Sequence, residues 1–137
     1  MSSNDNQTNQ LSVKTICHLI GRGYLNFSDI VNPTDQVQRA ALQRDPRNIR
    51  RITNPNEDLQ LLAVNCYGFA LRHIQQPTQK VQLAAVKERG DAIQFIKNPN
   101  ERTQLAAVRS NPYAIKYIKN PSEKVQIAAV NVDGRVI

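Results

Sequence analysis

Residues 77–98 read PTQKVQLAAVKERGDAIQFIKN, and residues 99–120 read PNERTQLAAVRSNPYAIKYIKN. Both stretches begin with proline, carry QLAAV in the middle and end with IKN in the same register. Prolines recur along the chain at this same spacing of 22 residues: Pro33, Pro55, Pro77, Pro99 and Pro121. Because self-similarity at a fixed period is typical of repeat proteins, we number each repeat from its proline as position 1.

Other positions repeat with the same regularity. Position 6 is always glutamine (Gln38, Gln60, Gln82, Gln104, Gln126), and position 9 is always alanine (Ala41, Ala63, Ala85, Ala107, Ala129). Apolar residues at positions 5, 8, 9 and 10 form one face of a helix, and isoleucine or leucine follows at positions 17 and 20. The pattern predicts an all-α fold, a right-handed α-solenoid of five to six 22-residue repeats with two short helices each.

The repeats divide the chain without insertions. Residues 11–32 fit the register loosely, with Phe27 and Ile30 at positions 17 and 20, and we interpret them as a degenerate capping repeat. The polar segment 1–10 is expected to be a disordered tail. The regular repeats are predicted to span 33–54, 55–76, 77–98, 99–120 and, in part, 121–137.

Helix start and stop signals place two helices in each repeat. An asparagine before the proline, as in Asn98-Pro99, is typical of an N-cap followed by proline at the first helical position. The carboxylate or amide at position 3 is then expected to reach back to this cap. The first helix is predicted to end at about position 13, before a proline or glycine, and the second to span about seven residues, as at 112–118.

The consensus NPxExVQLAAVxxxPxAIxxIK resembles the leucine-rich-repeat variant and HEAT-like short solenoids, in which a proline-started helix alternates with a shorter one. It is also similar to an uncharacterised helical repeat of bacterial, phage and giant-virus proteins. The resemblance implies an architecture and no particular activity, because these families share no single function. Some leucine-rich-repeat variant proteins hold a cysteine-ligated iron–sulfur cluster, which the two separated cysteines Cys17 and Cys66 do not favour.

Composition narrows the classes of function. The chain has 18 Lys and Arg against 11 Asp and Glu, and its pI of about 9.8 favours an acidic or polyanionic partner. Cys17 and Cys66 sit in no disulfide or zinc spacing, so we expect no metal, no cofactor and a reducing, cytoplasmic location. No long apolar run or leader-like N-terminus is present, so no membrane interaction is expected.

Catalytic patterns are missing from the sequence. His18 and His73, the only histidines, lie more than two repeats apart, and no phosphate loop, HExxH or GxSxG motif occurs. The acids at position 3 are expected to stack too far apart for two of them to act on one bond. The sequence therefore predicts a binding protein, not an enzyme.

Basic residues gather at a few positions of the repeat. Positions 4 and 11 of the first helix hold one stripe: Lys80, Lys87, Arg102, Arg109 and Lys124. Positions 18 and 21, in and after the second helix, hold another: Arg50, Arg72, Lys97, Lys116 and Lys119. Such stripes form either a ligand-binding surface or an ordinary solvated face.

The densest positive cluster lies in the first regular repeat: Arg39, Arg44, Arg47, Arg50 and Arg51. Arg39 occupies position 7, where later repeats carry Leu or Ile, and Asn48 interrupts the alanines of position 16. Because arginine forks suit phosphate and carboxylate, and a broken core pattern often marks a functional site, we predict partner binding here. The alternative is a wetter end repeat in which Arg39 pairs with Asp29 or Asp35.

Aromatic residues accompany the second stripe. Tyr113 and Tyr117 lie one helical turn apart, and Phe95 and His73 occupy the position of Tyr117 in the two preceding repeats. With Arg72 and Lys116 they form either a binding ridge or half-buried packing. The glutamines of position 6 also have two interpretations, a ladder that reads a ligand or amides that satisfy loop backbone groups.

We expect a non-catalytic interaction protein that binds an acidic segment of a partner protein. Sequence-independent binding of a nucleic-acid backbone is the main alternative. A small phage or viral effector that inhibits a host enzyme or defence complex is a second alternative, drawn from the resemblance alone. The last repeat stops at position 17, which predicts an apolar end face and a homodimer through Val125, Val130, Val136 and Ile137.

Overall fold

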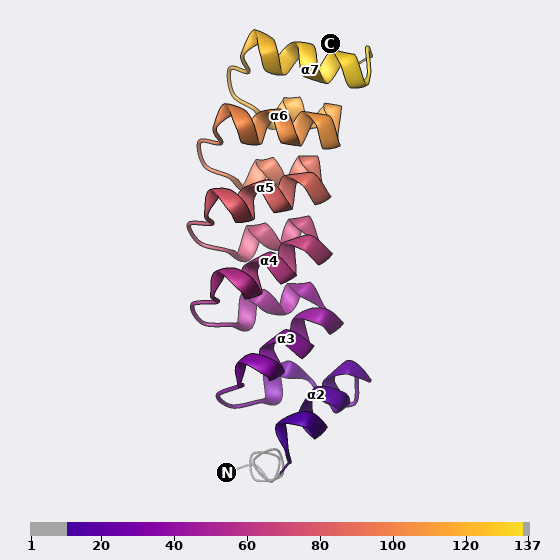
Figure 1. Cartoon of the computed structure of the whole chain (residues 1–137), viewed down its shortest axis with the longest axis vertical. Helices are drawn as coiled ribbons and strands as arrows, with labels where there is room; N and C mark the ends of the chain where they lie inside the picture. The colour runs from indigo at the N-terminus through magenta and orange to yellow at the C-terminus, as the bar shows by residue number, and fades with distance from the viewer. Residues whose placement is uncertain (1–10, 136–137) are drawn as a thin grey trace.

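The structure is a computed structural model that describes residues 11–135, so the predicted tail at 1–10 lies outside the described residues. Every regular element in this range is a helix, and successive helices pack in chain order into an elongated stack (Figure 1). The α-helices are α2 (Val13–Gly21), α3 (Asp35–Arg44), α4 (Glu57–Cys66), α5 (Gln79–Glu88), α6 (Glu101–Ser110) and α7 (Glu123–Val132). The 3-10 helices are η1 (Phe27–Asp29), η2 (Pro46–Arg51), η3 (Gly68–His73), η4 (Gly90–Phe95) and η5 (Pro112–Tyr117). The predicted all-α solenoid is confirmed.

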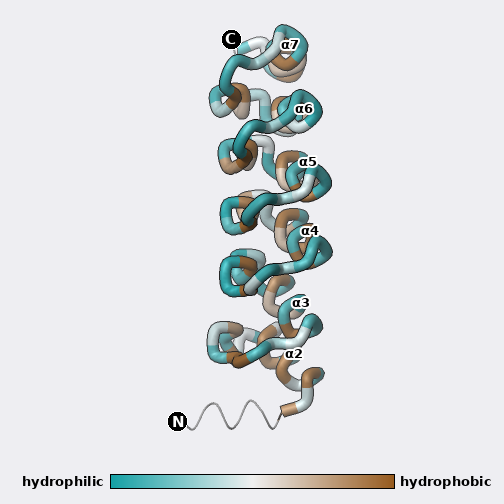
Figure 2. Tube along the Cα trace, turned by 90° about the vertical axis from the view of Figure 1, so that its left-hand side faces the viewer, coloured by the Kyte–Doolittle hydropathy of each residue, from teal (hydrophilic) through white to brown (hydrophobic). Residues whose placement is uncertain are grey.

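Each full repeat adds one α-helix and one 3-10 helix to the stack. In Figure 2 the α-helices form one column of the rod, and the 3-10 helices form a second column beside it. Contacts run between neighbours within each column, such as α4 with α5 and η3 with η4. None of the helices within residues 11–135 has the length and apolar character needed to cross a bilayer.

The second helix of each repeat is shorter than predicted and more tightly wound. In η3 the backbone N–H of Ala70 donates to the carbonyl of Tyr67 (2.8 Å), and the N–H of Ile74 donates to that of Leu71 (3.0 Å). The flanking residues Tyr67 and Ile74 are both extended, which leaves six residues for the helix. A segment this short closes more hydrogen bonds with three-residue turns than with four-residue turns.

The predicted N-cap is wrong by two residues. The cap is position 2, whose side chain accepts a hydrogen bond from the backbone N–H of position 5: Thr34, Asn56, Thr78, Asn100 and Ser122. The residue before each proline instead has a left-handed backbone, with φ between 48° and 55° at Asn32, Asn54, Gln76, Asn98 and Asn120. Proline disfavours a right-handed helical residue before it, and asparagine tolerates the left-handed region better than most residues.

In three repeats the side chain at position 3 bonds to the N-cap residue of the following repeat. The Thr78 hydroxyl donates to the Glu57 carboxylate (2.7 Å), and the Ser122 hydroxyl donates to Glu101 (2.9 Å). Asn100 donates its amide N–H to the Gln79 side-chain oxygen at 2.8 Å. Asp35, at the same position of the first regular repeat, instead pairs with Arg39 on its own helix. The prediction that the side chain at position 3 reaches back to its own cap is therefore wrong.

The glutamines of position 6 bond to backbone. Each side-chain amide donates to the carbonyl of the proline that opens its own repeat, at 2.8 to 3.2 Å. These bonds satisfy a carbonyl in the turn before the helix, as buried polar groups require. The hydrogen bonds therefore support the interpretation that the position 6 amides satisfy backbone groups, and not the interpretation that they read a ligand.

The core runs the length of the stack between the two columns. Alanines at position 9 are 0% exposed in every regular repeat, which lets neighbouring α-helices approach closely. Larger side chains fill positions 5, 10 and 17, among them Leu59, Val86 and Ile93, each at most 2% exposed. Each such side chain stabilises the fold by roughly 1.5–3 kcal/mol. Since these residues pack between repeats, the stack has one continuous core.

Candidate interaction surface on the 3-10 helices

One face of the stack carries positive charge without negative charge. Positions 16 to 22 of the four full repeats contain no Asp or Glu, and they hold six cations that we call the 3-10 cations: Arg50, Arg51, Arg72, Lys97, Lys116 and Lys119. Positions 17 and 20 are mostly buried, as at Ile49 (1% exposed) and Ile52 (8%). The residues between and after them, at positions 18, 19 and 21, therefore face outward, and all six cations are exposed.

Ion pairing distinguishes these cations from six other cations of the chain. Among the described residues, every Lys or Arg with a carboxylate oxygen within 4.0 Å lies outside the 3-10 cations: Arg39, Arg47, Lys80, Arg89, Lys124 and Arg135. Such exposed pairs add little stability, but each cancels charge locally. The 3-10 cations form no ion pair within residues 11–135, although the pKa of Asp45 is lowered first by the hydrogen bond from Arg47 and also by the charge of Arg50. The stripe on the α-helices has two of its five members, Lys80 and Lys124, already paired.

The five-arginine cluster does not form one site. Arg39 pairs with Asp35 one turn earlier on α3 (2.6 Å), which is one of the two structural partners the sequence suggested. Position 7 varies in burial, since Leu105 is 8% exposed, Leu61 and Leu83 are partly exposed and Ile127 is 51% exposed. The pairing of Arg39 with Asp35 supports the structural interpretation of this arginine.

The remaining arginines divide between local structure and the exposed face. Arg47 donates from Nε and Nη2 to Asp45 (3.0 Å each), and these bonds hold the pKa of Asp45 below its ordinary value. Arg44 lies against Gly23, where the guanidinium leaves little space for a side chain. Asn48 donates to the carbonyl of Ala41 (3.0 Å), so its place among the alanines of position 16 is structural. Only Arg50 and Arg51 of the cluster belong to the 3-10 cations.

His73 lies beside these two arginines. A hollow of about 470 Å³ between η2 and η3 is lined by Arg50, Arg51, Thr53, His73 and Gln75, together with the turn that follows η2. Burial, then the charges of Arg72 and Arg50, lower the pKa of His73 below its ordinary value. The imidazole is therefore neutral at pH 7 in the unliganded protein.

The predicted aromatic ridge is only partly exposed. Tyr117 is 39% exposed, with the Lys116 ammonium 5.0 Å from its ring centroid. Tyr113 is 47% exposed, and its hydroxyl donates to Asp133 in the last repeat (3.1 Å). Phe95 instead packs edge-on against Phe69, with ring centroids 5.4 Å apart. The ridge is thus available to a ligand at Tyr117 and Tyr113 and serves packing at Phe95.

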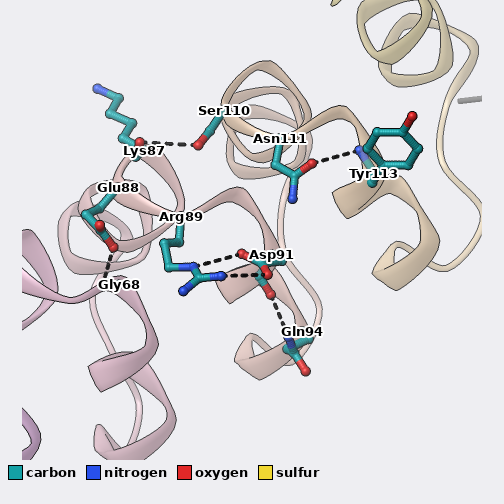
Figure 3. A network of polar contacts seen from close by, with 9 residues as sticks. All are labelled: Gly68, Lys87, Glu88, Arg89, Asp91, Gln94, Ser110, Asn111 and Tyr113. Atoms are coloured by element: carbon teal, nitrogen blue, oxygen red, sulfur yellow. Dashed lines mark hydrogen bonds and ion pairs between the residues drawn. The ribbon is translucent and has the colours of Figure 1, made fainter. Parts of the chain in front are cut away.

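Sequence reasoning missed the aromatic cluster around Phe69. Its ring lies 5.8 Å from that of Tyr67, and the Arg89 guanidinium sits 4.1 Å above it. Arg89 is in turn held by Asp91, and Glu88 accepts a hydrogen bond from the Gly68 backbone N–H (Figure 3). A regularity of the repeat could have indicated this cluster, because the residue at position 15 contacts the residue at position 13 of the next repeat. Phe69 with Arg89 and Tyr113 with Asp133 are both such pairs.

Two of the four residues predicted for the end-to-end interface, Val125 and Val130, lie within the described residues. Val125 is 0% exposed and so is not available to a partner, which corrects its assignment. Val130 is partly exposed, while Val136 and Ile137 lie outside the described residues. The apolar side chains exposed near this end are Ile127 and Val132, each 51% exposed.

Comparisons with known proteins give no assignment: no family model matches the chain, and no curated protein or solved structure is significantly similar to it.

Proposed function

We propose that this protein is a non-catalytic binding module that holds an acidic segment of a partner protein along the face of the 3-10 cations. The single observation that carries the proposal is the uncompensated charge of that face, with six exposed cations, no carboxylate in positions 16 to 22 and no ion pair to any of the six within residues 11–135. Arginine and lysine clusters of this kind recognise acidic motifs through charge-assisted hydrogen bonds.

The repeat spacing sets the form of the ligand. Neighbouring packed helices lie about 8–10 Å apart, and a ligand in the polyproline II conformation advances about 3.1 Å per residue with three residues per turn. About three residues of such a ligand therefore cover one repeat, and every third side chain lies on the same face. Carboxylates at every third residue would meet Arg72, Lys97 and Lys116 in turn.

A designed peptide tests this function. A fluorescently labelled peptide of about twelve residues with glutamate at every third residue should bind with a Kd on the order of 10 µM at about 50 mM salt. A matched peptide with lysine at the same residues should not bind, because its charges repel the face. No change in fluorescence anisotropy with the glutamate peptide, up to about 1 mM protein, would contradict the proposal.

Binding of single-stranded nucleic acid is a second candidate, favoured by one observation. Tyr117 is 39% exposed beside the Lys116 ammonium, and an exposed aromatic ring next to a cation suits a stacked base beside its phosphate. Gel-shift affinity for a random oligonucleotide should then be micromolar or better and fall steeply with salt, since counterions are released on binding. Absence of a shift at about 50 mM salt would remove this candidate.

A further inference from the structure

The hollow between η2 and η3 differs from the rest of the face because three nitrogen-rich side chains line it together. Arg50 and Arg51 come from η2 and His73 comes from η3. Thr53 and Gln75 add a hydroxyl and an amide, and none of the lining residues is a carboxylate. With a volume of about 470 Å³, the hollow is large enough for a small anionic group with part of the chain that bears it.

The pattern of the repeat changes at this place. Position 19 carries Phe95 and Tyr117 in the last two full repeats but Arg51 and His73 in the first two. Arg39 and Arg47 of the same region are each held by an aspartate, whereas Arg50 and Arg51 have no carboxylate within 4.0 Å among the described residues. The first two full repeats thus carry a guanidinium and an imidazole where the next two carry phenyl and phenol rings.

The charges around His73 are all positive. Arg50 and Arg51 approach from η2 and Arg72 from its own helix, while the turn before α4 and α4 itself contribute the uncharged Asn54, Pro55 and Gln60 to the hollow. Phe95 follows on η4 at the same position of the repeat. The lowered pKa of His73 reflects burial and these unbalanced cations, so an anion bound here would restore the pKa toward or above its ordinary value.

We propose that this hollow binds a phosphoryl dianion carried on a side chain of the partner's acidic segment. This inference rests on the proposed function and names the group that the segment presents at Arg50, Arg51 and His73. A phosphate monoester has a charge of about −1.5 to −2 at pH 7 and three acceptor oxygens, which match two guanidinium forks and one imidazole. A carboxylate offers one charge and two oxygens, and would leave part of the positive charge unmatched.

A matched pair of peptides tests the site. The twelve-residue glutamate peptide is made with serine or phosphoserine about three residues before its first glutamate. A second pair of peptides has the reversed sequence, so that both directions of the bound chain are tested. The phosphoserine form should bind at least about tenfold more tightly in one of the two directions. This gain should increase as the pH falls from about 7.5 to about 6.5, because His73 takes up a proton on binding while most of the phosphoserine, with a second pKa of about 6, is still the dianion.

Two variants that each lose two positive charges test whether the tighter binding of the phosphoserine peptide depends on the hollow. Arg50→Gln with Arg51→Gln should abolish the difference between phosphoserine and serine peptides. Arg102→Gln with Arg109→Gln removes the same charge from exposed side chains on α6 and should leave the difference intact. Equal loss in both variants would mean general electrostatic attraction and would overturn the site.

The two histidines give an independent readout. In NMR experiments, the phosphoserine peptide should raise the pKa of His73 and leave the chemical shifts of the His18 ring, on α2, unperturbed at constant pH. An oligonucleotide that raises the pKa of His73 to the same extent would assign the hollow to phosphodiesters and overturn the proposed source of the phosphoryl group.

The outcomes separate this inference from the function on which it rests. If serine and phosphoserine peptides bind equally, the phosphoryl site is overturned while binding of an acidic segment stands. If neither peptide binds, the proposed function fails. The effect of inorganic phosphate on the pKa of His73 then tests by itself whether the hollow binds a phosphoryl group. A rise in the pKa of His73 on addition of phosphate, lost in the Arg50→Gln, Arg51→Gln variant, would support a phosphoryl site. No change in this pKa would overturn it.

Discussion

Val86→Asp is expected to lower the free energy of unfolding by at least about 4 kcal/mol, because it buries an unpaired carboxylate. Val86 lies on α5 at position 10 and is 0% exposed, between the two columns of the stack. Repeats are stabilised mainly by their neighbours, so damage at a central repeat removes the support of both sides. Urea unfolding followed by far-UV circular dichroism measures the loss.

The same chemical change at an exposed site is the control. Val31 is 62% exposed in the turn before α3, and Val31→Asp should change the unfolding free energy by no more than about 0.5 kcal/mol. Similar losses in both variants would contradict the assignment of position 10 to the continuous core.

Gly90→Ala is expected to destabilise the protein by about 2–3 kcal/mol through overpacking. A Cβ at Gly90 would overlap the carbonyl oxygen of Ala107 and come within 2.8 Å of the backbone nitrogen of Asn111. Both obstructing groups are backbone of the following repeat, which cannot turn aside as a flexible side chain can. The substitution would therefore push η4 away from α6.

Gly134→Ala is a control at the same position of the last repeat, where a Cβ would meet nothing within 4 Å among the described residues. It should be neutral or stabilise by up to about 1 kcal/mol through the unfolded state. Thermal melting of the two variants compares them directly, and an unaffected Gly90→Ala protein would mean that neighbouring repeats are not packed as closely as the structure has them.

The architecture could be predicted from the sequence, because the same pattern occurs five times along the chain. The period of 22 residues, the alanines of position 9 and the end of each α-helix near position 13 follow from helical periodicity and from proline and glycine. The start of the α-helix was misplaced because an Asn–Pro pair suits both an N-cap and a left-handed turn. Only the backbone angle of residues such as Asn98, with φ of 55°, separates the two.

The candidate site was less predictable, because charge in a sequence does not show which charges are paired. Arg39, Arg47 and Arg50 looked alike as members of one cluster, yet Asp35 and Asp45 hold the first two, while Arg50 is exposed with no carboxylate oxygen within 4.0 Å among residues 11–135. The two basic stripes were equally plausible for the same reason. Pairs between successive repeats, such as Lys80 with Glu57, depend on how repeats stack, which the pattern of a single repeat does not contain.

The most direct test of the account compares the two faces at equal charge. One variant changes Arg50, Arg72, Lys97, Lys116 and Lys119 to glutamine, and the other changes Lys80, Lys87, Arg102, Arg109 and Lys124, so each loses five positive charges. Affinity for the glutamate peptide should fall by at least about 100-fold in the first variant and by less than about threefold in the second. Equal losses, or the larger loss from the α-helical stripe, would contradict the claim that the 3-10 helices carry the binding surface.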